Sequence, residues 1–146
     1  MKRTAFLQRK PKAKRPPPLV AKATGASAKG YKSPIRDQAH MARIAALGCL
    51  ICGHPSHAHH CDVVVAKGMG PKVSDYMTAP LCPDHHLNNK HDCAHGYGGE
   101  RAFWTRHGID IAAWIVRTLT DWYPGGANPG ADAAIEAING WRRIET

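Results

Sequence analysis

The sequence predicts a small α+β domain that is held together by a structural zinc ion, flanked by helices and preceded by a disordered basic tail. The chain has 146 residues, enough for one small domain and a tail. All five cysteines and seven of the ten histidines lie between positions 49 and 93, and the positive charge is concentrated at the N-terminal end. A domain this small buries a modest fraction of its surface, so a bound metal ion is a common additional source of stability.

The basic tail covers residues 1–32, and the domain is predicted to cover residues 33–146. Residues 1–40 hold eleven of the twenty Lys and Arg residues but one of the eleven acidic residues. The tail has few large apolar side chains, so burial cannot repay the entropy of folding and we expect disorder. Such a tail can hold DNA phosphates, with a purely solubilising tail as the alternative. The predicted DNA contacts are Lys10, Lys12, Lys14 and Arg15.

The first predicted helix follows the tail. Ser33 is a good N-cap, and Pro34 suits the first helical position. Apolar residues then recur at helical spacing up to about Leu47, and Gly48 can end the helix.

Two strands and a short helix are predicted next. The segment from His57 to Val65 alternates loosely and ends in β-branched residues, which favours a strand. Met77 to Leu81 can form the returning strand, and Pro83 can start a helix that runs to about Asn89. Three further helices are predicted over residues 100–107, 111–122 with Asp110 as N-cap, and 131–139.

The cysteines indicate a reducing compartment. Their number is odd and no apolar run of signal-peptide length follows the basic start, which argues against a disulfide framework. The longest apolar stretches are too short to span a bilayer. We therefore expect a soluble, cytoplasmic and monomeric protein that makes no membrane contact.

Two sequence pairs form the predicted zinc site. Cys49 and Cys52 are separated by two residues, and so are Cys82 and His85. This spacing lets both side chains of a pair reach one ion, and together the four ligands form a closed tetrahedral Cys₃His site of the structural type. The alternative is a set of buried free thiols with a surface histidine.

A second constellation consists of the His59-His60 pair and of His86, which follows His85. Hydrolysis of a phosphodiester needs an attacking water, a group that takes its proton and positive charge on the phosphate. A histidine can serve as the base and a divalent ion as the Lewis acid. Adjacent residues of a regular strand point to opposite faces, so His59 and His60 need a twisted hairpin to share one site.

These motifs resemble the HNH nucleases of phages, and most closely the Ref-like, RecA-dependent nuclease family. The resemblance covers residues 40–120 and rests on Cys49-Leu-Ile-Cys52, Ala58-His59-His60, Asp75, Ala79-Pro-Leu-Cys82-Pro-Asp-His85-His86 and Ala94-His95-Gly96. It implies a ββα-metal core and a DNA endonuclease that acts in phage recombination. It also implies a RecA–single-stranded DNA filament as partner, and a phage or prophage gene expressed in a bacterial host.

The resemblance also implies a role for each histidine. His60 corresponds to the general base, and His85 to the fourth zinc ligand. His59, His86 and His95 correspond to the ligands of the catalytic Mg²⁺ or Mn²⁺, with His91 as the alternative to His95.

Three functions are weighed on these observations. A metal-dependent DNA endonuclease explains both constellations. A zinc-stabilised DNA-binding module without catalysis leaves His59, His60, His86 and His95 unexplained. A redox protein that uses Cys49 and Cys52 lacks the βαβ context of that motif. Cys61 and Cys93 are interpreted as packed thiols, with a second structural site as the alternative.

Overall fold

The computed structural model describes residues 35–65 and 73–145. The chain divides into two units, Met1–Tyr31 and Lys32–Thr146, and all described residues belong to the second. The predicted tail and its DNA contacts, Lys10, Lys12, Lys14 and Arg15, therefore lie outside the described residues. Within the described ranges, no helix combines the length and apolarity needed to cross a membrane.

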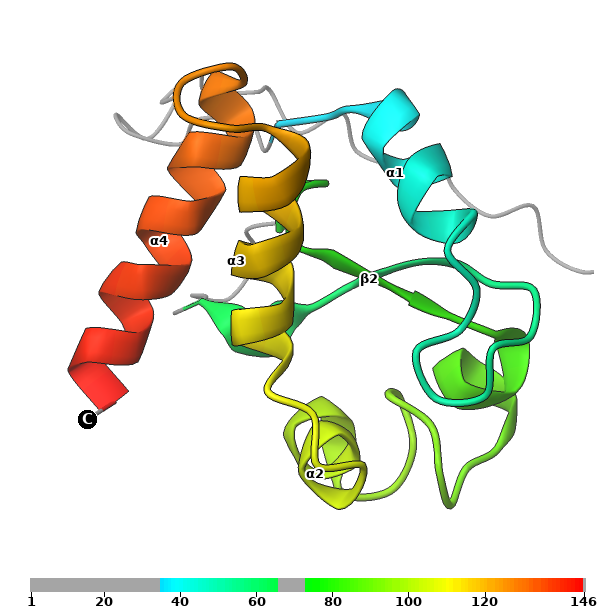
Figure 1. The fold of residues 1–146 in the computed structure, drawn as a ribbon. Helices are drawn as coiled ribbons and strands as arrows, with labels where there is room; N and C mark the ends of the chain where they lie inside the picture. The colour runs from blue at the N-terminus through cyan, green and yellow to red at the C-terminus, as the bar shows by residue number, and fades with distance from the viewer. Residues whose placement is uncertain (1–34, 66–72, 146) are drawn as a thin grey trace, which may run out of the picture. The chain divides into compact units, whose positions relative to one another are not determined.

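The described part of the chain is a small α+β fold with one two-stranded sheet, as predicted (Figure 1). The strands are antiparallel, with His57 opposite Leu81 and His60 opposite Thr78. The elements in order are α1 Gln38–Ala45, β1 His57–His60, the 3₁₀ turn η1 Asp62–Val64, β2 Thr78–Leu81, the π-helical turn η2 Asp84–Asn88, α2 Gly99–Arg106, α3 Ile111–Trp122 and α4 Pro129–Glu145.

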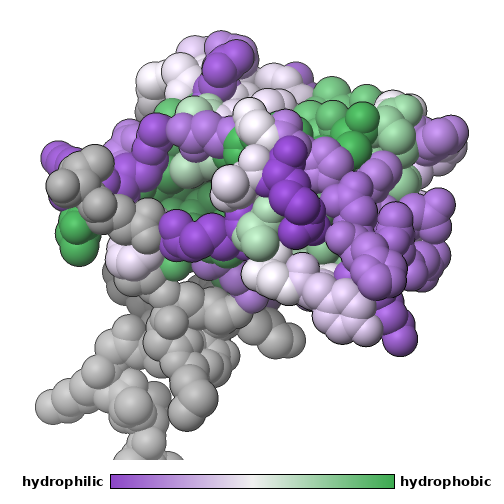
Figure 2. All heavy atoms as spheres, turned by 90° about the horizontal axis from the view of Figure 1, so that it is seen from below, coloured by the Kyte–Doolittle hydropathy of each residue, from purple (hydrophilic) through white to green (hydrophobic). Residues whose placement is uncertain are grey.

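Helices cover the hairpin and bury β2 completely. In Figure 1, α1 lies over the hairpin on one side, and α3 lies over β2 with α4 alongside it. Leu81, Phe103, Ile115, Leu119 and Ile138 form the centre of the core. Burial of each such side chain is worth about 1.5–3 kcal/mol, so the core fixes the hairpin that carries the histidines. Seen from below, the surface is mostly hydrophilic, with hydrophobic patches between polar side chains (Figure 2).

The first helix begins later than predicted. Ser33 and Pro34 lie outside the described residues, and α1 begins at Gln38 with Asp37 as its N-cap. The Asp37 carboxylate accepts a hydrogen bond from the His40 amide at 3.0 Å. Residue 35 is held outside the helix because the Ile35 carbonyl accepts a hydrogen bond from the Asp75 amide.

The first strand is shorter than predicted, because β1 ends at His60. The amide of Asp62 donates a hydrogen bond to the Glu100 carboxylate at 3.0 Å, and the chain turns through η1. Val64 then enters the core and does not continue the sheet. The returning strand begins within one residue of its prediction.

The C-terminal helices differ in how well they match the bounds predicted from the sequence. Helix α3 has the predicted bounds and the predicted cap, since Asp110 accepts a hydrogen bond from the Ala113 amide. Helix α4 is longer than the predicted 131–139. Asn128 begins it, because its side-chain oxygen accepts hydrogen bonds from the amides of Gly130 and Ala131, and Pro129 suits the first position.

Candidate metal centres

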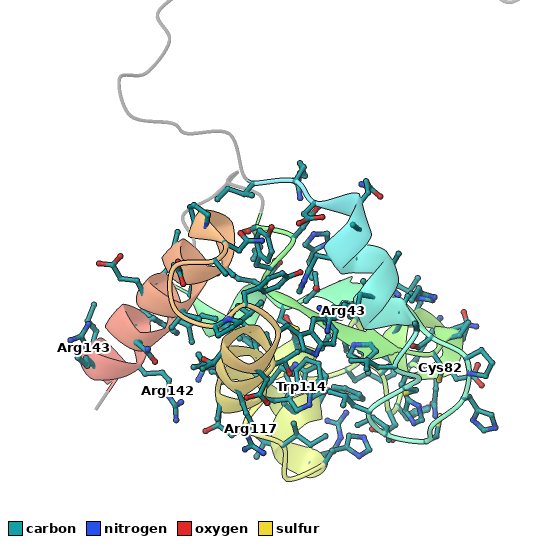
Figure 3. All side chains as sticks on the ribbon, turned by 45° about the horizontal axis from the view of Figure 1, so that its top comes forward. Arg43, Cys82, Trp114, Arg117, Arg142 and Arg143 are labelled. Atoms are coloured by element: carbon teal, nitrogen blue, oxygen red, sulfur yellow. The ribbon has the colours of Figure 1, made fainter. Side chains whose placement is uncertain are left out.

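A cluster of three cysteines and one histidine can hold a metal ion such as zinc. The ligand atoms of Cys49, Cys52, Cys82 and His85 all lie within 4.8 Å of one another. Cys52 Sγ and Cys82 Sγ are 3.6 Å apart, and Cys82 Sγ is 3.2 Å from His85 Nδ1. Three sulfurs and one imidazole nitrogen match the donor set of a structural zinc site. In Figure 3, Cys82 lies far from Arg142 and Arg143 at the end of α4.

Backbone hydrogen bonds shape the first half of this cluster before any ion binds. The Gly53 amide donates to the Cys49 carbonyl, and the Cys49 amide donates to the His54 carbonyl. The Ile51 amide points at Cys49 Sγ at 3.4 Å. Gly48, with φ of +79°, leads the chain into this turn in a conformation that favours glycine. The turn is joined to β2 because the Leu50 amide donates to the Pro80 carbonyl.

The thiol groups influence one another's ionisation. Burial raises the pKa of Cys49, but hydrogen bonds from the backbone amides of Cys82, Cys52 and Ile51 outweigh it and leave the pKa lowered. The amide of His54 lowers the pKa of Cys52, whereas burial and the neighbouring thiols raise it more. Several thiolates at this spacing repel one another, and a bound cation would remove that repulsion.

An acidic residue lies near His85 on the side of the ring that faces away from the cysteines. Its Nε2 lies 4.0 Å from the Asp92 carboxylate, which also accepts a hydrogen bond from His107 Nε2 at 2.8 Å. Burial raises the pKa of Asp92, but His107, His85 and Arg106 lower it more, so this carboxylate is ionised at neutral pH. Sequence spacing did not indicate this ion pair, which places a negative charge next to His85.

A second cluster consists of three histidines without sulfur. Ligand atoms of His59, His86 and His95 lie within 4.8 Å of one another. His59 is buried, His86 is half-buried and His95 is exposed, so the cluster opens to solvent. This set has fewer protein ligands than the cysteine cluster, and three imidazoles leave coordination positions for water or substrate.

Element η2 connects the two clusters, because it carries His85 toward the cysteines and His86 toward the other histidines. Its wide turn is closed by the Asn89 amide donating to the Asp84 carbonyl. His95 reaches the same place because the amides of Ala94 and His95 donate to the carbonyls of His85 and His86. A side chain at Gly96 would collide with the Lys90 carbonyl, so the loop that carries His95 needs glycine there.

His57 lies on the same face of the hairpin as His59 and orients the ring of His86. Its Nε2 is 2.6 Å from His86 Nδ1. Burial, together with the neighbouring His59, His57 and His95, lowers the pKa of His86 to about 4. At neutral pH His86 is therefore uncharged, which is the state that binds a metal ion. The sequence did not indicate this role of His57.

His60 lies on the other face of the hairpin, as expected for neighbouring residues of a regular strand. Its Nε2 is 2.9 Å from the Asp75 carboxylate, which also accepts a hydrogen bond from Arg36 at 2.6 Å. Asp75 is 2% exposed and His60 37% exposed. Burial raises the pKa of Asp75, but hydrogen bonds from His60, the Asp37 amide and Arg36 lower it more. A buried, ionised carboxylate thus holds a solvent-accessible imidazole.

Asp75 is in turn connected to the helices. Its second oxygen accepts a hydrogen bond from the Asp37 amide at 2.9 Å. The Asp37 carboxylate accepts a hydrogen bond from the Tyr76 hydroxyl, which accepts one from the side chain of Asn128. Through this chain of bonds the first turns of α1 and α4 support the position of His60. The resemblance included Asp75 but gave it no role.

Glu100 is a largely buried acidic residue next to His59 that the sequence motifs did not indicate. Its carboxylate lies 3.1 Å from His59 Nε2 and accepts a hydrogen bond from Trp104 Nε1 at 3.0 Å. The available signal was an acidic residue in the first turn of a helix, which is common because the helix dipole favours it there.

The remaining candidates have clear positions. His91 lies against the ring of Tyr97, whereas His95 lies with His59 and His86, so the geometry favours His95 as the third ligand. Cys61 and Cys93 are both buried. Burial raises the pKa of Cys61 well above its usual range, and Glu100 raises it further, which keeps this thiol protonated. Cys61 also groups with His59 and Glu100 as a possible ligand set.

Comparisons of the chain with models of protein families, with curated proteins and with solved structures give no match.

Proposed function

We propose that this protein is a metal-dependent DNA endonuclease of the HNH type, with a structural zinc ion at the cysteine cluster and a catalytic Mg²⁺ or Mn²⁺ at the histidine cluster. The observation that carries the proposal is the presence of two separate ligand clusters with different donors around one hairpin and the short helix after it. The order of hairpin and helix is compatible with the ββα-metal core that the resemblance implies. A purely structural protein needs only the first cluster.

The chain's own residues can perform the acid–base chemistry. Asp75 holds His60 at Nε2, which leaves Nδ1 of this half-exposed ring to take a proton from the attacking water. His59, His86 and His95 would hold the divalent ion, which supplies Lewis acidity at the phosphate and the leaving oxygen. His60 and His59 are neighbours in β1 but lie on opposite faces of the hairpin, so the base and the metal centre share one strand and the attacking water would have to lie within reach of both faces.

The basic tail completes the proposal, since its charge suits a DNA backbone. We propose action on DNA in phage recombination with a RecA filament as partner, on the resemblance alone. Residues 1–32 would add affinity for DNA, and the near-neutral domain would cleave it.

A cleavage assay tests the function. The zinc-loaded protein is incubated with supercoiled plasmid and with a D-loop, with and without Mg²⁺ or Mn²⁺ and with and without a recombinase filament. We expect nicked or cut DNA only when a divalent ion is present, and far less product from His60→Ala than from the native protein. If the folded, zinc-loaded protein binds DNA but cuts neither substrate under any condition, the zinc-stabilised DNA-binding module is the correct function.

A further inference from the structure

We propose that Glu100 is a positioning residue of the histidine cluster, whose carboxylate fixes the ring of His59 and adds a negative charge next to the bound ion. The inference rests on the proposed function, since it concerns the same metal centre. Neither the sequence motifs nor the resemblance assigns a role to Glu100.

The Glu100 carboxylate is held in place from three directions. One oxygen lies 3.1 Å from His59 Nε2 and accepts a hydrogen bond from Trp104 Nε1 at 3.0 Å. The other accepts a hydrogen bond from the Asp62 amide at 3.0 Å. The Glu100 side chain is 10% exposed and the His59 side chain 2%. A carboxylate with this many donors is a fixed part of the site and cannot swing freely into solvent.

The position of Glu100 suits support of a ligand better than direct ligation in the three-histidine set. Glu100 groups with His59 and Cys61 as possible ligands, whereas His59 groups separately with His86 and His95. His59 is the residue that the two groups share. It therefore connects the carboxylate to the metal centre.

The hydrogen bond determines which nitrogen of His59 can bind the ion. A neutral imidazole that donates its Nε2 hydrogen to Glu100 keeps its lone pair on Nδ1. Carboxylates paired with histidine ligands fix the tautomer and raise the basicity of the ligand. The remaining ligands are neutral imidazoles, which by themselves suit softer ions than Mg²⁺ or Mn²⁺. The charge of Glu100 would favour the binding of these harder cations.

Two measurements on the full, zinc-loaded chain test the inference. Titration of Mn²⁺ is followed by calorimetry for the native protein and for Glu100→Gln, with Glu136→Gln on the exposed surface of α4 as the matched control. We expect Glu100→Gln to weaken Mn²⁺ binding about 10–100-fold, as other changes to residues that support ligands do. The control should bind Mn²⁺ like the native protein. Thermal unfolding and zinc content establish that both variants are folded.

The second measurement needs no catalytic ion. Long-range proton–nitrogen NMR correlations on the native protein without Mn²⁺ should show His59 protonated at Nε2. A proton on Nδ1, or a folded Glu100→Gln protein with native Mn²⁺ affinity, would overturn the role of Glu100 while the proposed function stands. Native protein that binds no Mn²⁺ but has His59 protonated at Nε2 would instead contradict the catalytic centre and leave the positioning of His59 intact.

Discussion

The two ligand clusters lie on either side of η2 and differ in almost every property that matters for metal chemistry. The cysteine cluster has four ligands and three sulfurs, with two of its members buried. The histidine cluster has three nitrogen ligands, includes the exposed His95 and lies next to the carboxylate of Glu100. A closed sulfur-rich set retains its ion and stabilises a fold, whereas an open nitrogen set leaves room for water and phosphate. The cysteine cluster therefore suits a structural ion, whereas the histidine cluster suits an ion that water and substrate can reach.

Loss of a cysteine ligand should have the largest effect on the protein. Cys82→Ser removes a ligand at the junction of β2 and η2, and the energy of zinc binding is folding energy in small domains of this kind. We expect loss of the zinc and of cooperative unfolding, measured by metal analysis and circular dichroism.

Cys93→Ser is the matched control, since Cys93 is also buried but lies outside the four-ligand cluster. It should keep its zinc and its cooperative unfolding transition. A folded Cys82→Ser protein with native zinc content would show that the cluster has no structural role.

Loss of the Asp75 charge next to His60 should slow cleavage and leave the fold intact. Asp75→Asn keeps the shape of the side chain but removes the charge that holds His60 and Arg36. We expect about a 10–100-fold slower cleavage, which is part of the roughly 10²–10⁴-fold that a positioned acid–base group contributes. Single-turnover rates measure this loss, with the exposed Asp121→Asn as control. An unchanged rate in folded Asp75→Asn would show that His60 needs no such support.

The tail should affect binding alone. Deletion of residues 1–32 should weaken DNA binding and reduce its dependence on salt, by about one unit of slope for each phosphate contact that is lost. Both clusters should keep their metal affinities, because their ligands all belong to the described domain. Filter binding at several salt concentrations measures the slope, and an identical slope in the truncated chain would support a purely solubilising tail.

The smallest expected effect concerns a buried histidine outside both clusters. His40 packs against Tyr76, Trp122 and Tyr123. Burial lowers the pKa of His40, and this outweighs the raising effect of Asp37 and Asp75. The folded state therefore stays neutral while the unfolded chain takes up a proton near its ordinary pKa, about 6.5. The free energy of unfolding should consequently fall as the pH drops below that value.

Comparison with a variant isolates this contribution. His40→Gln should lose less stability than the native protein between about pH 7.5 and about pH 5.5, measured by urea unfolding at constant zinc. The carboxylates with lowered pKa titrate at more acidic pH and do not interfere. Equal pH dependence in the two proteins would mean that folding does not lower the pKa of His40.

Local features were predictable from the sequence, and features that depend on distant contacts were not. The two pairs of the cysteine cluster each lie within one turn of chain, so spacing alone indicated all four ligands. Helix α3 matched because Asp110 caps it from the adjacent position. The predicted start of α1 was wrong because Asp75 and Tyr76, far along the chain, hold Ile35 and Asp37 in place by hydrogen bonds. Glu100 was missed for the same reason, since His59 lies 41 positions away.

Metal rescue shows whether His59 and His86 are ligands of the divalent ion while His60 is the general base. Single-turnover cleavage is measured against Mn²⁺ concentration for the native protein and for His59→Ala, His86→Ala and His60→Ala. We expect excess Mn²⁺ to restore part of the cleavage by His59→Ala and His86→Ala. His60→Ala should stay roughly 10²–10⁴-fold slower at every concentration, because it binds the ion but lacks the proton acceptor. Rescue of His60→Ala to the same extent as His59→Ala would show that His60 is a metal ligand and not the base.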